Sequence, residues 1–248
     1  MDVAAAMARA GNRILSFMVS VMIIIMLLYG GYSIWDSYTS FNGAFVSNDL
    51  LEFKPPVNKT EKANPTLSEL QKINPDVCAW LTIDDTNIDY PVVQGVDDME
   101  YINKNVYGEY EMSGSIFLSY MNSRDFSDSY NLLYGHHMAN GAMFGDVVKF
   151  MDRDYFKSHP TGTLYLPNET YRISVFACMS TDAYDRRIFN PPSQQGEEFS
   201  AFLSYVQDYS SQYRNIGVDK NDRVVALSTC SNAATYGRIV LFGRLEAQ

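Results

Sequence analysis

The chain has 248 residues, 46% of them hydrophobic, and a formal charge of −10 at pH 7. An acidic chain has no basic surface with which to neutralise phosphates, so we expect no nucleic-acid partner. Its three cysteines cannot build a disulfide framework and show no C-x-x-C pairing typical of a zinc site. The composition therefore favours a globular protein with free thiols.

An uncharged segment near the N-terminus, Ile14 to Trp35, is long enough to cross a bilayer, at about 33 Å for a helical rise of about 1.5 Å per residue. Two arginines precede it, and the first charge after it is Asp36, so the positive-inside rule puts the N-terminus in the cytoplasm. A cleaved signal peptide is the alternative, but the segment is longer than the usual apolar region and no A-x-A-like site follows it. We predict a single-pass anchor over residues 1–35, with the rest of the chain outside the cell membrane.

Residues 36–65 are predominantly polar and contain Pro55-Pro56, which is typical of a stalk. Thr66 and Glu69 have capping-box spacing, so we expect a short helix to start at Thr66 and to end before Asn74-Pro75. We expect one catalytic domain over residues 66–248, because no internal repeat or second domain is apparent. An exported chain without disulfides fits a Gram-positive bacterium.

The domain is rich in short β-type segments bounded by Gly, Pro, Asn or Asp. Eight strands are expected: Val77–Ile83, Ile88–Val93, Ser115–Leu118, Leu132–Tyr134, Thr163–Leu166, Tyr171–Ala177, Val224–Leu227 and Arg238–Leu245. Helical periodicity appears only in inserts, at Met143–Met151 and Glu197–Tyr213. The second insert carries an apolar stripe that we interpret as core: Phe199, Phe202, Leu203, Val206 and Tyr209. The pattern predicts a mainly β fold with helical inserts, closed as a barrel or a sandwich.

The three cysteines differ in their surroundings. Cys78 and Cys178 lie inside apolar runs, where a cysteine usually packs as a small hydrophobe. Cys230 ends an apolar run, but Ser228 and Thr229 precede it directly and polar residues follow it. A thiol at a polar strand end is a candidate nucleophile, and it needs a partner that shares its proton.

Histidine is the usual partner of a reactive thiol, and the chain has three. His136 and His137 follow an apolar strand, and because adjacent side chains on a strand face opposite sides, both cannot address Cys230. The residues alone leave that choice open. His159 lies in a polar turn and is interpreted as a solvated loop residue. Arg238 opens the next apolar strand, where a guanidinium could stabilise an oxyanion.

Two other classes of protein deserve comparison. A papain-like peptidase uses the same thiol and imidazole, but its cysteine comes early in the domain, whereas Cys230 comes late. A non-enzymatic, membrane-anchored β-domain that binds a cell-wall component would bury Cys230. Accessibility of this thiol to alkylation separates that alternative from an enzyme.

Several motifs together resemble those of the sortases, and specifically of class B. They are Leu227-Ser228-Thr229-Cys230, Tyr134-Gly135-His136-His137-Met138, Arg238, Trp80-Leu81-Thr82-Ile83, Ile88 to Gly95, Gly114 to Leu118 and Met143-Phe144-Gly145. The resemblance runs from about Thr66 to Leu245, and the insert Glu197–Tyr213 is similar to one that distinguishes class B. It implies an eight-stranded sortase barrel behind the N-terminal membrane helix.

The resemblance also implies roles for individual residues. Cys230 would be the nucleophile, His136 the proton donor and acceptor, and Arg238 the group that stabilises the oxyanion or holds the substrate backbone. Tyr134, Ser228 and Thr229 match positions that line the substrate groove. The reaction implied is cleavage of a C-terminal sorting signal after threonine, through a thioester, followed by transfer to an amine.

The implied partners are surface proteins with a sorting signal of the N-P-x-T-x or S/P-P-x-T-G type, and peptidoglycan or its lipid-linked precursor as amine acceptor. No metal or organic cofactor is expected, because no acidic cluster with calcium-ligand spacing or nucleotide-binding glycine loop is present. Asp84-Asp85 and Asp97-Asp98 are interpreted as turn residues. Asn232 stands where some class B members have an acidic residue, so we assume no carboxylate partner there.

Overall fold

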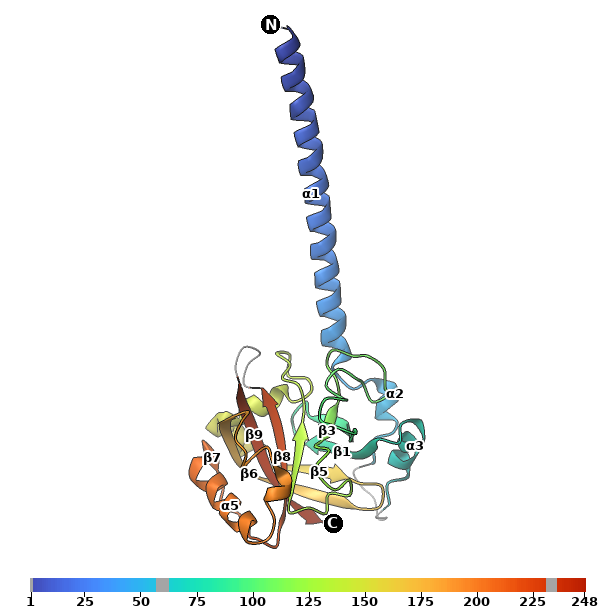
Figure 1. Ribbon diagram of the computed structural model, residues 1–248. Helices are drawn as coiled ribbons and strands as arrows, with labels where there is room; N and C mark the ends of the chain where they lie inside the picture. The colour runs from blue at the N-terminus through green and yellow to red at the C-terminus, as the bar shows by residue number, and fades with distance from the viewer. Residues whose placement is uncertain (1, 57–62, 231–235) are drawn as a thin grey trace. The chain divides into compact units, whose positions relative to one another are not determined.

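The structure is a computed structural model that describes residues 2–56, 63–230 and 236–248. The chain divides into two compact units, Met1–Asn42 and Gly43–Gln248. Helix α1 (Asp2–Gly43) makes up the first unit, and its segment Val3–Tyr38 is long and apolar enough to cross a membrane (Figure 1). A signal sequence near the N-terminus can satisfy the same criteria of length and hydropathy.

The second unit is an eight-stranded closed β-barrel. Its strands follow the order β5-β1-β2-β3-β4-β8-β9-β6, and β6 pairs with β5 to close the ring. Most neighbours are antiparallel, but β2–β3 and β4–β8 are parallel pairs. The fold class predicted from the sequence is confirmed, and a two-residue strand, β7, adds to the edge of β6.

The barrel strands agree with the expected segments to within two residues at most ends, and β6 is the main exception. The strands are β1 (Val77–Ile83), β2 (Asp89–Val93), β3 (Ile116–Leu118), β4 (Tyr130–Tyr134), β5 (Thr161–Tyr165), β6 (Thr170–Asp182), β7 (Gln212–Tyr213), β8 (Arg223–Cys230) and β9 (Gly237–Ala247). Strand β6 runs five residues past its expected end because its ladder with β9 continues to the pair Asp182 and Gly237.

Helices connect and cover the strands. They are α2 (Asn48–Leu51), α3 (Pro65–Ile73), the 3₁₀ helix η1 (Gly145–Met151), α4 (Arg153–Ser158), the 3₁₀ helix η2 (Pro191–Ser193) and α5 (Glu197–Tyr209). The expected helix at Met143–Met151 is a 3₁₀ helix, and α4 was not predicted. The expected helix to Tyr213 ends at Tyr209, because Gln212 and Tyr213 pair with β6 instead.

Alternation along the strands sorts the buried side chains into an inner and an outer set. All eight barrel strands contribute to one cluster, which therefore fills the interior; Leu133 and Leu227 belong to it. The alternate residues Leu132 and Ala226 belong to a second cluster, which α5 covers from outside (Figure 1). In the expected stripe on α5, Phe199, Phe202 and Val206 are buried, but Tyr209 is 63% exposed.

The segment expected as a stalk packs partly on the barrel. Leu50 is buried in a third cluster together with α3, and Lys54 forms an ion pair with Asp89 of β2 at 2.6 Å. Residues 57–62 lie outside the described residues. A domain that starts at Gly43 therefore includes these contacts of Leu50 and Lys54, and a domain that starts at residue 66 lacks them.

The predicted capping box at Thr66 is wrong. Helix α3 begins one residue earlier, at Pro65, whose fixed φ suits the first helical position. Asn64 is at the N-cap position but does not cap the helix, because its amide donates to the Leu166 carbonyl at 2.6 Å. The predicted end before Asn74 is confirmed, since α3 stops at Ile73.

Candidate active site

The parallel pairing of β4 and β8 brings the two chemical motifs to one edge of the barrel. Tyr134 at the end of β4 pairs with Ser228 near the end of β8. Strand β9 runs antiparallel to β8 and starts at the same edge, where Arg238 pairs with Cys230. Residues following β4, ending β8 and opening β9 therefore meet there.

Strand alternation also puts these side chains on the same face. Ala226 and Val240 lie in the outer cluster under α5, so Ser228, Cys230 and Arg238, which follow the same alternation, face the outside of the barrel. The site is thus a surface groove next to the outer cluster, and the barrel interior does not form it.

The glycine at position 135 is explained by steric contacts. A Cβ at Gly135 would overlap the side chains of Ile116 and Phe144, so glycine fits here without displacing either of them. Its N–H donates to the Ser228 carbonyl at 3.2 Å, and the Thr229 hydroxyl donates to the Gly135 carbonyl at 2.9 Å. These bonds tie the backbone that precedes His136 to the strand that carries the cysteine.

A pocket of about 270 Å³ lies at this edge. It is lined by Asp98, Ile102, Phe117, Tyr134, Gly135, His136, Ser228, Thr229, Cys230 and Arg238. All six residues named from the sequence, catalytic and substrate-binding, are among these. His137 is not in the lining; its backbone forms a bridge with Met143, and its Nδ1 is buried without a hydrogen-bond partner in the described part of the chain.

Two side chains of the pocket are oriented by backbone carbonyls. His136 Nε2 lies 2.8 Å from the Ile102 carbonyl oxygen, and Arg238 Nη1 donates to the Gly237 carbonyl at 3.1 Å. The guanidinium has five N–H donors, so this bond leaves others for a ligand. A thiol, an imidazole and a guanidinium are thus gathered in one groove.

The thiols differ as expected. Cys78 and Cys178 are buried, and burial raises the pKa of the Cys78 thiol to about 12 and the pKa of the Cys178 thiol further still. Only Cys230 is partly exposed. Because the thiolate is the nucleophilic form, the two buried cysteines are inert at neutral pH.

Four lining residues were given no site role from the sequence: Asp98, Ile102, Phe117 and Gly135, of which the last two lie in motifs quoted above. Asp97 is the turn residue expected, accepting from the N–H groups of Met99 and Glu100, but Asp98 lines the pocket. Burial raises the pKa of the Asp98 carboxyl, although bonds from Tyr120 N–H and the Ser119 hydroxyl oppose it. No sequence motif marks Asp98 or Ile102, since both lie in an irregular loop.

The pKa of the Tyr134 hydroxyl is also raised, first by burial and then by the Asp98 carboxylate, while Arg238 opposes the rise. Its ring contacts Phe117 and stacks on Phe189, with centroids 5.3 and 6.3 Å apart. Tyr134 thus remains a neutral, aromatic wall of the groove. Within residues 2–56, 63–230 and 236–248, no group of three metal-ligating side chains is found. Asn232 lies outside the described residues.

The arrangement matches a known family. The family model described as Sortase domain matches residues 81–246. The chain belongs to the sortase family. A curated relative, Sortase B of Listeria monocytogenes, is 35% identical over 190 residues, which are 76% of this chain and 77% of that protein.

Solved structures place the protein in class B. A Streptococcus pyogenes class B sortase involved in pilus biogenesis is 44% identical with a TM-score of 0.67, covering 72% of this chain and 97% of that one. Sortase B from Bacillus anthracis, solved in complex with AAEK1, is 30% identical with a TM-score of 0.75, covering 86% and 100%. This sortase is therefore a cysteine transpeptidase of class B, and the binding-domain alternative is wrong.

Proposed function

We propose that this sortase cleaves a C-terminal sorting signal after threonine through a thioester on Cys230, and joins the released carbonyl to a peptidoglycan amine. The observation that carries the proposal is one pocket in which Cys230, the one partly exposed cysteine among the described residues, lies with His136 and Arg238. The assignment of roles follows from the chemistry of these three groups.

In the first half-reaction, the Cys230 thiolate attacks the threonyl carbonyl carbon and forms a C–S bond. Negative charge then develops on the carbonyl oxygen, where the Arg238 guanidinium donates hydrogen bonds. When the C–N bond breaks, protonated His136 gives its proton to the departing amine. The thioester and a neutral imidazole remain.

In the second half-reaction, the acceptor amine attacks the thioester and His136 takes a proton from it. The C–S bond breaks, and Cys230 leaves as a thiolate beside an imidazolium, which restores the starting state. Water can replace the amine slowly and gives hydrolysis. The acceptor is the amine of a peptidoglycan cross-bridge or stem peptide, or its lipid-linked precursor.

Tyr134, Ser228 and Thr229 line the groove around these three residues and are proposed to bind the sorting signal. Ser228 is 2% exposed, and its hydroxyl has no hydrogen-bond partner among the described residues. A peptide backbone bound in the groove would supply the partner that this buried hydroxyl lacks. The signal is of the N-P-x-T-x or S/P-P-x-T-G type.

We also propose that α1 anchors the enzyme with its N-terminus in the cytoplasm, because Arg9 and Arg13 precede the uncharged segment. A membrane-impermeant thiol reagent applied to intact cells tests this, since Cys230 is partly exposed whereas Cys78 and Cys178 are buried. Labelling of intact cells that is lost in Cys230→Ala supports the orientation. Labelling that requires cell lysis would refute it.

The function is tested with quenched peptides that carry the two types of sorting signal, with and without an added amine. Cleavage after threonine, and a product whose mass includes the amine, are expected for the native enzyme and not for Cys230→Ala. Each remaining role has a matched control: His136→Ala against His159→Ala, and Arg238→Ala against Arg172→Ala at the other end of the barrel.

For Arg238→Ala we expect a loss of about 10²–10³-fold in kcat, the range typical of a lost oxyanion donor. The two control variants should keep native activity, because neither control residue lines the pocket. Native rates for His136→Ala or Arg238→Ala would contradict the assigned roles. A library in which no peptide is cleaved would contradict the proposed substrate class.

A further inference from the structure

His136 has a fixed backbone partner on one side of its ring. Its Nε2 lies 2.8 Å from the Ile102 carbonyl oxygen, and a carbonyl can only accept a hydrogen bond. Nε2 must therefore carry the proton in this arrangement, and in the neutral ring the lone pair lies on Nδ1. The contact distinguishes the two ring nitrogens before any substrate binds.

We propose that the Ile102 carbonyl locks His136 in the Nε2–H tautomer, so that Nδ1 exchanges protons with the leaving and incoming amines, and that Tyr101 and Gly114 position this carbonyl. The proposal rests on the proposed role of His136. The proton count is unchanged: Nε2–H stays bonded to Ile102 throughout, and one proton leaves Nδ1 and later returns to it.

Gly114 lies directly against the oxygen that accepts from His136. A Cβ at this position would overlap the Ile102 carbonyl oxygen and approach the Tyr101 carbonyl, and Gly114 also has φ +60°. The neighbouring Ser115 N–H donates to the Tyr101 carbonyl at 3.1 Å. The backbone at 114–115 thus contacts the peptide groups on both sides of Ile102.

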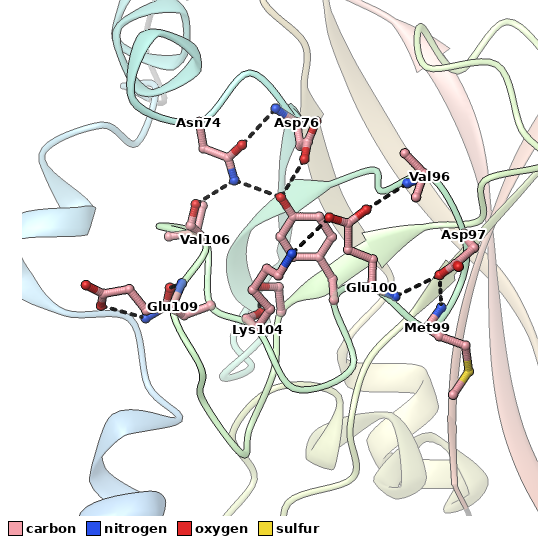
Figure 2. Close-up of polar contacts among 12 residues, drawn as sticks. Asn74, Asp76, Val96, Asp97, Met99, Glu100, Lys104, Val106 and Glu109 are labelled. Carbon is pink, nitrogen blue, oxygen red and sulfur yellow. Dashed lines mark hydrogen bonds and ion pairs between the residues drawn. The ribbon is translucent and has the colours of Figure 1, made fainter.

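Tyr101 ties the same loop to the segment between α3 and β1. Its ring is 2% exposed, and its hydroxyl donates to Asp76 Oδ2 at 2.7 Å and accepts from Asn74 Nδ2 at 3.0 Å. The same Asn74 amide donates to the Val106 carbonyl at 2.7 Å, so one buried amide spans both sides of the loop (Figure 2).

Surface contacts complete the support of the loop. Glu100 accepts from the Val96 N–H and from Lys104, and Asp97 accepts from the Met99 N–H (Figure 2). The Lys104–Glu100 pair is partly buried and the other two contacts are exposed, and ion pairs near the surface contribute little individually. The position of Ile102 therefore depends on the hydrogen bonds that the Tyr101 hydroxyl makes with Asp76 and Asn74. Tyr101 is a positioning residue.

The first test is the tautomer itself, measured on the full chain in detergent micelles with ¹⁵N-labelled histidine. Three histidines give three ring patterns, and His136→Gln assigns the one of interest. We expect neutral His136 to show the Nε2–H pattern in long-range proton–nitrogen spectra. An Nδ1–H pattern would overturn the proposal, and this readout does not depend on any peptide being cleaved.

The second test compares Tyr101→Phe with Tyr110→Phe, a tyrosine of the same loop that is 78% exposed. We expect Tyr101→Phe to lower kcat about tenfold with KM within about twofold, and to raise the Nδ1–H population, because small displacements of a reacting group reduce rate strongly. Tyr110→Phe should match the native enzyme in both. Native kcat and tautomer in folded Tyr101→Phe would overturn the positioning role.

Gly114→Ala is the independent variant, since it disturbs the Ile102 carbonyl without touching the Tyr101 hydroxyl. Like Tyr101→Phe, Gly114→Ala is expected to raise the Nδ1–H population of His136. If the native enzyme cleaves no sorting peptide, the proposed function fails, and the tautomer measurement still decides the inference about Ile102.

Discussion

Removing the hydroxyl of either of two adjacent residues on β8, Ser228 or Thr229, should have opposite effects on the stability of the domain. The Thr229 hydroxyl, on a side chain 2% exposed, joins β8 to the carbonyl of Gly135, 94 residues away in the sequence. Thr229→Val keeps the shape but removes this bond and leaves a carbonyl unpaired. A hydrogen bond lost in this way costs about 1–2 kcal/mol.

For a domain of this size, such a loss lowers Tm by about 2–8 °C, at about 2–4 °C per kcal/mol. The neighbouring Ser228 hydroxyl is equally buried and has no partner among the described residues. Ser228→Ala removes an unpaired polar group, so Tm should not fall and can rise by about 1–3 °C.

The assay is thermal unfolding of residues 43–248 at neutral pH, with Thr229→Ser as the variant that restores the hydroxyl. We expect the Tm of Ser228→Ala to equal or exceed that of the native domain, the Tm of Thr229→Ser to come next, and that of Thr229→Val to be lowest. Equal Tm values for Thr229→Val and the native domain would refute it. So would a fall for Ser228→Ala as large as that for Thr229→Val.

Three further predictions concern the rest of the domain. Burial raises the pKa of Asp98 above its ordinary value of 3.8, so the folded state holds the proton more tightly, and stability falls as pH rises from that value through the raised pKa. The Tm advantage of Asp98→Asn over the native domain should therefore grow with pH across this interval. An advantage independent of pH would contradict this prediction. Phe202→Ala should lower the free energy of unfolding, measured in urea, by about 3–5 kcal/mol, whereas Tyr209→Ala on the same helix should have little effect. Similar losses of unfolding free energy for both variants would show that α5 is not held by its buried face. A domain that starts at Thr66 should unfold at lower temperature than one that starts at Gly43, since it lacks buried Leu50 and the Lys54–Asp89 ion pair; equal values would mean that residues 43–65 add no stability.

The barrel was predictable because its strands are short, apolar and separated by turn residues. The main strand error, in β6, occurred where the alternation stops being apolar after Met179 while backbone pairing with β9 continues. Thr66 was misjudged because proline at position 65 provides a start signal that competes with a capping box. Strand β7, with two residues, is too short to give a periodic signal.

The site was predictable where chemistry selects rare residue types. A single polar-flanked cysteine and two adjacent histidines were visible in the sequence. The residues alone left the choice between the histidines open, the family resemblance favoured His136, and the structure puts His136 and not His137 in the pocket lining. The Ile102 carbonyl could not be predicted at all, because a backbone acceptor leaves no trace in residue type. Gly114 was visible within a family motif, but its contact with Ile102 appears only in the structure.

The parallel pairing of β4 and β8 has a consequence for when activity arises. The two strands lie far apart in sequence, so their pairing requires closure of a long loop, which is slow compared with local contacts. Cys230, the proposed nucleophile, lies on β8, and Arg238 lies on β9. A chain in which β8 and β9 have not yet paired with the rest of the barrel therefore carries these groups in separate, inactive pieces, and reactivity of Cys230 toward substrate reports that the whole barrel has closed.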